Sequence, residues 1–412
     1  MNTSRFFAIT DRYPRLRIAV VGDFFLDRYL QIDPAKGETS IETGLPVYNV
    51  VDVRSQPGAA GTILNNLAAL GVGSIHAVGF CGDDGEGYEL RRALAAQPGV
   101  DLEHFLTVPS RRTPAYYKPL VWEGSRPPRE LNRLDSKNWT PTPAELQRDL
   151  ADRVAALAEH VDALLLLDQV ELPETGVLTR PVLEAAHAAL RLRGGLTVLA
   201  DCRRGLQQFP PLDFKMNAAE LARMMGPAPA DLDAVKRLAA ELSGRNGRPA
   251  FVTLDARGIV GASPGLRPEH VPAHPVRGPI DVVGAGDAVT ANLAAALAAR
   301  ADVREAMELA MAAASLVIHQ LGTTGAASRA QIAELLGLAR PQSRESCSTA
   351  RSSQATVGEF AESPDATPRG VPSTDPGVGP GNGTPVPAVV PGSGRHESQP
   401  TTASVRDEST RR

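Results

Sequence analysis

The segment Asp281-Val-Val-Gly-Ala-Gly-Asp287 runs directly into the alanine-rich segment AVTANLAAALA, residues 288–298. Val289, Leu293 and Leu297 recur at intervals of four, so we expect a helix with one packed stripe to begin at the glycines. Small residues let the backbone approach a ligand closely, and the free N–H groups at the start of a helix attract anions. The segment therefore predicts an anion-binding turn at the start of a helix.

Asp287 closes this turn, where its carboxylate could accept the proton of an attacking hydroxyl group during phosphoryl transfer. The backbone of residues 284–286 would then stabilise the charge that gathers on the transferred group. The simpler alternative is a glycine turn whose aspartate only caps a helix. Short glycine motifs are common, so the residues of this segment alone leave both interpretations open.

Outside this segment, apolar runs of strand length alternate with helical patterns. The runs are Arg17–Val21, Ala163–Leu167, Thr197–Ala200 and Ala250–Leu254. A carboxylate follows each run, at once or after one glycine: Asp23, Asp168, Asp201 and Asp255. Unbroken apolar strands separated by helices indicate a mostly parallel sheet covered on both faces, a three-layer α/β/α fold. Ligands of such sheets bind at the carboxyl ends of the strands, where these carboxylates are expected.

Two segments do not follow this alternation. Pro46–Arg54 and Ala115–Trp122 are rich in Val, Tyr and Trp. They predict a small β-layer, or lid, built from about residues 29–54 and 112–135, with Gly124–Arg129 as a turn.

The composition changes near Pro341, after which Pro, Ser, Thr and Gly predominate without a periodic apolar pattern. Such a segment cannot bury enough surface to offset its ordering entropy. The sequence therefore predicts one folded domain over residues 1–340 and a disordered tail over residues 341–412.

The bulk composition excludes several classes of function. A formal net charge of −4 and an aromatic content of 4% argue against a nucleic-acid partner. No uninterrupted apolar run reaches membrane-spanning length, and the charged N-terminal residues do not resemble a signal peptide. The cysteines cannot complete a disulfide framework, which favours a reducing cytoplasm: they are Cys81, Cys202 and Cys347.

The glycine segment resembles the D-T-x-G-A-G-D signature of ribokinase-like (PfkB) carbohydrate kinases. Further segments resemble motifs of that family in the family's order: Gly22–Asp27, Pro57–Gly71, Gly79–Gly85, Lys215–Glu220 and Thr253–Gly258. The nearest resemblance is to heptose 7-phosphate kinases, carried by VVGDFFLDRY (20–29), IETGLPVYNV (41–50) and HQLGTTGAAS (319–328). Some of those kinases are fused to a nucleotidyltransferase domain, whose HxGH-type motif this sequence lacks.

The resemblance implies that ATP phosphorylates a hydroxyl of a sugar or sugar phosphate. Asp287 would be the base, and the anion hole would be formed by Gly284, Ala285 and Gly286. Asn217 and Glu220 would order water around Mg²⁺ near the ATP phosphates, with Thr253 and Gly258 beside the nucleotide. The sugar contacts would come from Asp27, Gly58, Asn66 and Asp281. A homodimer through the lid and a monovalent cation are further features that the resemblance implies or allows.

Several of these residues have a structural alternative. Asn217 and Glu220 have the spacing of a helix capping box, which is compatible with the magnesium role. Asn66 lies in an apolar helical pattern and fits a hydrogen-bonded core amide as well as a sugar contact. Asp168 is either a turn residue or a wall of the substrate channel, and Thr142 is expected to cap a helix that begins at Pro143.

The sequence departs from the family pattern mainly on the sugar side. Val282 replaces the usual Thr, and Phe25, Ala59 and Thr62 stand where a ribokinase would have Asn, Gly and Asn. These departures disfavour a simple pentose, and a phosphorylated substrate would need cations, for which the candidates are Lys118, Arg133 and Arg203. Another small-alcohol or nucleoside kinase, and a catalytically silent sugar- or nucleotide-binding regulator, are the alternatives.

Overall fold

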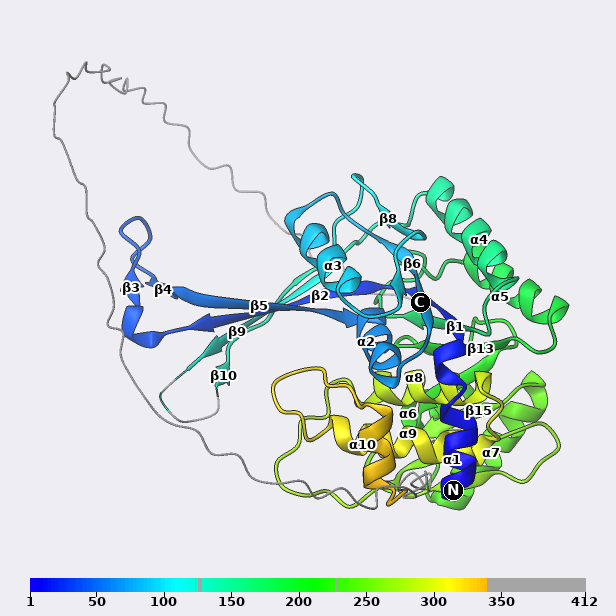
Figure 1. Ribbon diagram of the computed structural model, residues 1–412. Coiled ribbons are helices and arrows are strands. Elements are labelled where there is room, and N and C mark those ends of the chain that lie inside the picture. The colour runs from blue at the N-terminus through cyan, green and yellow to red at the C-terminus, as the bar shows by residue number, and fades with distance from the viewer. Residues whose placement is uncertain (123, 125–127, 227, 339–412) are drawn as a thin grey trace, which may run out of the picture. The chain divides into compact units, whose positions relative to one another are not determined.

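The computed structural model describes residues 1–122, 124, 128–226 and 228–338, and Figure 1 shows their arrangement. The predicted tail over residues 341–412 and residues 125–127 of the predicted turn lie outside the described residues. No helix in the described ranges is both long enough and apolar enough to cross a lipid bilayer.

The main sheet follows the order β17-β16-β15-β14-β13-β12-β1-β6-β7, and β8 pairs with β6. All neighbours from β15 to β7 run parallel, whereas β16 and β17 add an antiparallel edge. Its strands are β1 (Arg17–Gly22), β6 (Ser74–Cys81), β7 (Val100–Asp101), β8 (Phe105–Thr107), β12 (Ala163–Asp168), β13 (Thr197–Cys202), β14 (Asp213–Asn217), β15 (Ala250–Thr253), β16 (Ile259–Ala262) and β17 (Glu269–Val271). The predicted parallel sheet is confirmed, and the predicted apolar runs form β1, β12, β13 and β15.

Helices cover both faces of this sheet. One layer consists of α1 (Thr3–Thr10), α2 (Ala60–Leu70), α3 (Gly85–Ala95), α8 (Ala285–Ala298), α9 (Val303–Val317) and α10 (Arg329–Leu335). The other consists of α4 (Ala144–Ala158), α5 (Arg180–Leu192), α6 (Ala218–Met225) and α7 (Leu232–Asn246). Alternate residues of β1 enter the two cores: Ile18 and Val20 pack in one, Ala19 and Val21 in the other. The three-layer α/β/α prediction is thus confirmed.

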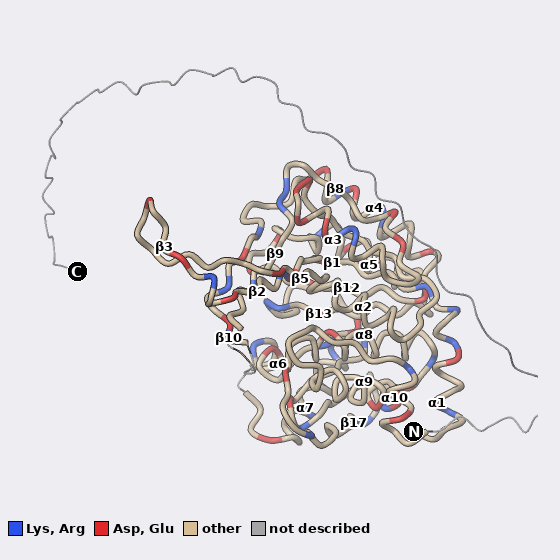
Figure 2. The backbone as a smooth tube through the Cα atoms, turned by 60° about the vertical axis from the view of Figure 1, so that its left-hand side comes forward, with Lys and Arg blue, Asp and Glu red and all other residues tan. Residues whose placement is uncertain are grey.

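A second sheet projects from the body of the fold, as Figures 1 and 2 show, and we call it the lid. Its order is β10-β9-β2-β5, with β11 paired to β9. The strands are β2 (Phe24–Ile32), β5 (Val50–Ala59), β9 (Ala115–Val121), β10 (Arg129–Glu130) and β11 (Leu134–Ser136), and a small hairpin joins β3 (Glu38–Thr39) to β4 (Pro46–Val47). Because β2 continues directly from β1, the lid is anchored at the carboxyl edge of the main sheet.

Two local predictions were wrong. Thr142 does not cap α4, because its buried hydroxyl donates to the Gly176 carbonyl and Pro143 becomes the N-cap residue. Helix α8 does not have a single packed stripe, because residues 288–296 are buried all round. The helix lies between the sheet and the neighbouring helices α2 and α9, so small alanine side chains suit every face of it.

Candidate active site

Helix α8 begins at the predicted anion-binding turn. Gly284 is its N-cap residue and has a φ of 83°, a left-handed conformation that glycine adopts without steric cost. A Cβ atom on Gly284 would lie only 3.3 Å from the Thr324 Cβ, so a side chain would crowd the turn. Ala285 N–H donates to the Val282 carbonyl, whereas Gly286 and Asp287 stand in the first turn, where N–H groups have no intrahelical acceptor. The turn can therefore offer donors and the positive end of the helix to an anion.

Asp287 is half-buried in this first turn. Burial raises the pKa of its carboxyl group to about 7; Lys215 acts in the opposite direction, and Asp201 and Asp27 reinforce the increase. A base whose pKa lies near neutral pH can accept a proton and still be ionised in a large fraction of molecules. Because Asp27 acts electrostatically on Asp287, the predicted base and this predicted sugar-side residue belong to one site.

A charged group that the sequence did not reveal lies under the turn. Lys215 Nζ in β14 donates to Asp201 Oδ2 in β13 at 2.6 Å, and both side chains are largely buried. The same Asp201 oxygen accepts from Thr290 Oγ1 of α8 at 3.1 Å. A Cβ atom placed on Gly286 would lie 3.3 Å from Lys215 Nζ, so the ammonium lies directly beside the turn. The sequence placed Asp201 directly after an expected strand and Lys215 at the start of the Lys215–Glu220 segment, but it did not indicate that the two side chains pair.

Asp27 lies on the lid side of the site, in β2, with only 4% of its surface exposed. Its Oδ2 accepts from Lys118 Nζ of β9 at 3.0 Å. A Cβ atom on Gly58 would lie 2.9 Å from Asp27 Oδ1, so β5 needs glycine there to approach the carboxylate. The structure thus brings together Asp27 and Gly58, two of the predicted sugar-side residues, but Lys118 is already paired to Asp27.

The other two predicted sugar-side residues hold a neighbouring loop. Asn66 is fully buried in α2, and its Nδ2 donates to the carbonyls of Thr62 and Gly325. Asp281 Oδ1 accepts from Val283 N–H at 3.0 Å, and its Oδ2 accepts from Gly322 N–H at 3.3 Å. These contacts support the core-amide alternative for Asn66, and direct sugar contacts from Asn66 and Asp281 stay predictions.

The lid also reaches this loop. Arg54 of β5 donates to the Gly322 carbonyl at 2.7 Å, and Gln56 exchanges hydrogen bonds with Thr323 and Thr324. Thr324 is the residue that packs against Gly284. A chain of contacts therefore runs from the lid strand to the anion-binding turn.

Asn217 and Glu220 form the capping box of α6: each side chain accepts from the backbone N–H of the other. Burial raises the pKa of the Glu220 carboxyl group. Oxygen donors of this kind suit Mg²⁺, and their remaining lone pairs fit contact through water, since Mg²⁺ usually keeps several of its waters. The described residues contain no cluster of three or more His, Cys, Asp or Glu side chains that could hold a metal by itself. The pair therefore fits a water-mediated role beside ATP phosphates, which stays a prediction.

Thr253 and Gly258 flank the turn between β15 and β16. Thr253 Oγ1 donates to the Met216 carbonyl at 3.4 Å. Gly258 has a φ of 94°, and a Cβ atom there would lie 2.1 Å from the Val271 carbonyl oxygen. Gly258 thus has a backbone reason to be glycine, and the nucleotide contacts of both residues stay predictions.

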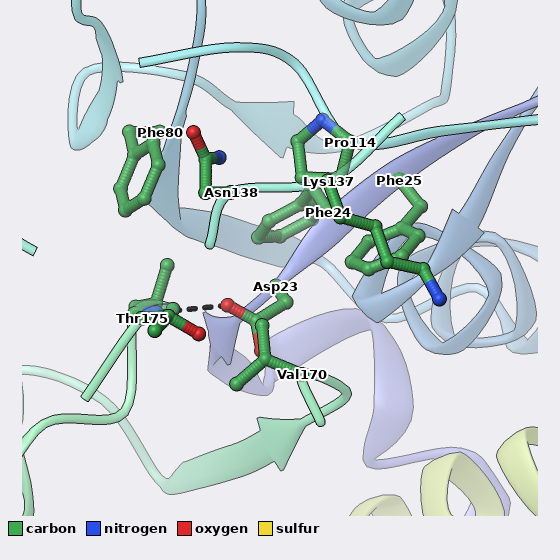
Figure 3. Close-up of a pocket in the computed structure, with 11 residues that line it drawn as sticks. Asp23, Phe24, Phe25, Phe80, Pro114, Lys137, Asn138, Val170 and Thr175 are labelled. Carbon is green, nitrogen blue, oxygen red and sulfur yellow. Dashed lines mark hydrogen bonds between the residues drawn. The ribbon is translucent and has the colours of Figure 1, made fainter. Parts of the chain in front are cut away.

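Asp23 and Asp168 are buried, and their carboxylates already have partners within the protein. Figure 3 shows Asp23 between Val170 and Thr175 on one side and the rings of Phe24 and Phe25 on the other. The pocket there has a volume of about 10 Å³, enough for a water-sized molecule only. Burial and the nearby Asp168 raise the pKa of Asp23 to about 7, although its oxygens accept from two backbone N–H groups. Asp168 is ion-paired to Arg204 and is 1% exposed, so it does not line an open channel.

A basic cluster surrounds Tyr116 of β9, which lies opposite Asp27 in the lid sheet. Burial raises the pKa of Tyr116, while Lys137, Arg203 and Arg133 act in the opposite direction. The Arg133 guanidinium lies 4.2 Å from the centre of the Tyr116 ring, and Phe25 packs on that ring at 4.9 Å. Within the described residues the buried Tyr116 hydroxyl has no hydrogen-bond partner.

A model of the pfkB family of carbohydrate kinases matches residues 30–330, well over half of the chain. A "Bifunctional protein HldE" from Azorhizobium caulinodans is 32% identical over 74% of this chain and 61% of that protein. The protein of that name from Azotobacter vinelandii is 33% identical over 76% of this chain and 62% of that protein. The chain thus spans less than two thirds of the length of these relatives, and it belongs to the pfkB family of carbohydrate kinases.

Solved structures share the fold. Arabidopsis thaliana ribokinase complexed with ribose and ATP aligns with a TM-score of 0.58 at 22% identity, over 78% of this chain and 98% of that chain. Escherichia coli phosphofructokinase-2 in complex with substrates and products aligns with a TM-score of 0.61 at 19% identity, over 79% of this chain and 100% of that chain. The ribokinase-like architecture expected from the motifs is thereby confirmed.

Proposed function

We propose that this chain transfers the γ-phosphoryl group of ATP to a hydroxyl of a sugar that already carries a phosphate, of the heptose 7-phosphate class. The observation that carries the proposal is Asp287, a carboxyl group with a pKa of about 7 in the first turn of α8, beside the donors of Gly286. A binding protein has no need of a base at this place. The order of the other motifs and the membership of the pfkB family agree with it.

In the proposed reaction, Asp287 accepts the proton of the sugar hydroxyl as its oxygen attacks the γ-phosphorus. The bond from phosphorus to the β–γ bridging oxygen breaks, and ADP leaves with the electron pair. The first-turn N–H groups of α8 stabilise the charge on the transferred group. Mg²⁺, when bound, would neutralise the ATP phosphates, and Asn217 and Glu220 are the residues that would orient its water ligands.

The basic cluster around Tyr116 supports a phosphorylated substrate. A buried phosphate needs charged or N–H and O–H donors, and the cluster combines Arg133, Arg203 and an unpartnered Tyr116 hydroxyl beside Asp27. Two of the cations already carry ion pairs: Lys137 pairs with Asp135 and Glu171 at 3.0 and 2.6 Å, and Arg133 pairs with Asp135 at 2.7 Å. Phe25 replaces a sugar-binding amide with a ring that supports Tyr116, which suits a substrate other than a simple pentose.

The surface of the lid supports the formation of a homodimer. It exposes apolar side chains that nothing in the described chain covers: Ile41, Leu45, Tyr48, Val50, Val51 and Val53. Such a patch on a projecting sheet fits a second copy of the lid. We also infer a cytoplasmic location from the free, buried thiols of Cys81 and Cys202.

The proposal is tested by measuring ADP release with ATP, Mg²⁺ and a panel of sugar phosphates, matched free sugars and nucleosides, with and without K⁺. Sugar phosphates should give the highest kcat/KM. Asp287→Asn should lower kcat by about 10²–10⁴-fold while ATP still binds. A panel without any turnover would support a silent binder, and preference for a nucleoside or free sugar would move the chain to another kinase class.

A further inference from the structure

We propose that Lys215 is a positioning residue for phosphoryl transfer, which favours the ionised form of Asp287 and fixes positive charge beside the anion-binding turn. This inference rests on the kinase function proposed above and assigns the Asp201–Lys215 pair to it. The argument comes from the place of the ammonium group and from the charges that face it.

Lys215 interrupts a buried strand. Its neighbours Phe214 and Met216 are about fully buried, and Lys215 itself is 7% exposed. Burying an ammonium group is costly unless it is paired and hydrogen-bonded. Burial by itself would lower the pKa of Lys215, but Asp201 at 2.6 Å raises it above its ordinary value. The pairing with Asp201 therefore favours the charged form of Lys215.

Carboxylates from several elements surround the Lys215 ammonium group. Asp201 on β13, Asp287 on α8 and Glu220 on α6 all act electrostatically on Lys215, and Asp27 on β2 acts on Asp287. Several carboxylates thus converge on one ammonium group. Its loss would leave these carboxylates without their buried cation, and Asp287 would become harder to ionise.

Thr290 connects the pair to the catalytic helix. Its hydroxyl lies 3.1 Å from Asp201 Oδ2 and 3.0 Å from the Gly286 carbonyl, and its single proton can serve one of these acceptors at a time. Asp201 therefore contacts both Lys215 in the sheet and the second turn of α8. This arrangement fixes the distance between the ammonium group and the turn, so a shorter or neutral side chain at position 215 cannot replace it.

The test compares the pH dependence of kcat/KM in Lys215→Met, Lys215→Arg and Asp201→Asn with that of the unaltered protein. The acidic limb of the profile reports the ionisation of Asp287. Lys215→Met should move its midpoint up by about one pH unit or more, since an opposite charge nearby accounts for shifts of that size. Asp201→Asn removes a like charge and should move the midpoint down, whereas Lys215→Arg should keep it close to the original value.

Opposite shifts distinguish this role from a structural one, because a residue that only supports the fold would lower the melting temperature and leave both midpoints in place. Unmoved midpoints, or shifts of the same sign, would overturn the proposal. If Lys215→Met does not fold, Lys215→Gln, which also removes the charge but keeps a hydrogen-bonding group, takes its place, and an unmoved midpoint in that variant overturns the proposal.

A second readout separates this inference from the proposed function. Carboxyl ¹³C NMR of the protein without nucleotide or magnesium follows the Asp287 resonance, assigned by its loss in Asp287→Asn. If no substrate of the panel turns over, the kinase proposal fails, while the NMR midpoints in the Lys215 and Asp201 variants still decide the electrostatic role of Lys215.

Discussion

Lys118 Nζ lies 3.0 Å from Asp27 Oδ2, and the two side chains are 11% and 5% exposed. They come from adjacent lid strands, and the Tyr29 hydroxyl lies 3.3 Å from the same ammonium group. Such a pair is held together because either charge alone would be buried without compensation. Lys118 is therefore committed to the sugar-side aspartate, which separates its expected role from that of the arginines around Tyr116.

Lys118→Ala should impair every sugar substrate, phosphorylated or not. Without the ammonium group, Asp27 loses the partner that holds its carboxylate in place. A hydrogen bond to a charged group is worth about 1.5–3 kcal/mol, so we expect KM for the sugar to rise about tenfold or more. KM for ATP should change little, because Lys118 acts on the lid side of the site.

Lys36→Ala is the matched control for this substitution. Lys36 also lies in the lid region and pairs with an aspartate, Asp33, at 2.7 Å, but its side chain is 61% exposed. Exposed pairs contribute little, so this variant should behave like the unaltered protein. A Lys118→Ala enzyme with an unchanged KM for all sugars would contradict the assignment of Asp27 and Lys118 to the sugar side.

Arg203→Ala and Arg133→Ala should act differently, because these arginines act on Tyr116, whereas Lys118 is hydrogen-bonded to Asp27. We expect each to lower the ratio of kcat/KM for a sugar phosphate to that for the matching free sugar, by about tenfold for a lost charge-assisted contact. Arg245→Ala on α7, an exposed arginine of a weak ion pair, serves as the control. Equal losses on both substrate types would place the substrate phosphate elsewhere.

The sequence predicted those parts of the fold that depend on short runs of neighbouring residues. The apolar runs of β1, β12, β13 and β15 are uninterrupted because both faces of these strands are buried, and the carboxylates that follow them mark the ligand edge. The glycine turn before Asp287 was equally legible, since a left-handed Gly284 and a helix start are local features. In these places a few neighbouring residues determine the structure.

The parts that were missed depend on contacts between distant residues. Asp201 and Lys215 lie on neighbouring strands, and Phe25 meets Tyr116 across the lid sheet, which no local pattern records. Thr142 was expected to cap α4, but its hydroxyl donates a hydrogen bond to the distant Gly176 carbonyl. The role of Asn66 shows the same limit, because its partner Gly325 comes from the other end of the domain.

Removal of residues 341–412 should leave the kinase unchanged. Their composition lacks the periodic apolar residues that a packed segment requires. A chain ending at Arg340 should therefore keep the melting temperature and the kcat of the full chain, measured side by side. A lower melting temperature or a lost activity in the shortened chain would mean that these residues pack on the domain.

The last prediction concerns stability at the catalytic aspartate. The pKa of Asp287 is raised by burial to about 7 from an ordinary value of 3.8, so between these values the folded protein binds a proton that the unfolded chain releases. The free energy of unfolding contributed by this group is therefore greatest below pH 3.8 and is lost as the pH rises through 7.

Asp287→Asn replaces the carboxyl group with a neutral amide of similar size, so it removes this loss. We expect the variant to melt at a higher temperature than the unaltered protein at pH 8, with a difference that shrinks steadily toward pH 5. Asp233→Asn on α7, whose side chain is 80% exposed, serves as the control. Thermal unfolding over this pH range measures both variants. A stability gain that is equal at all pH values would mean that the surroundings of Asp287 do not raise its pKa toward 7. The acidic limb of the activity profile would then belong to another group.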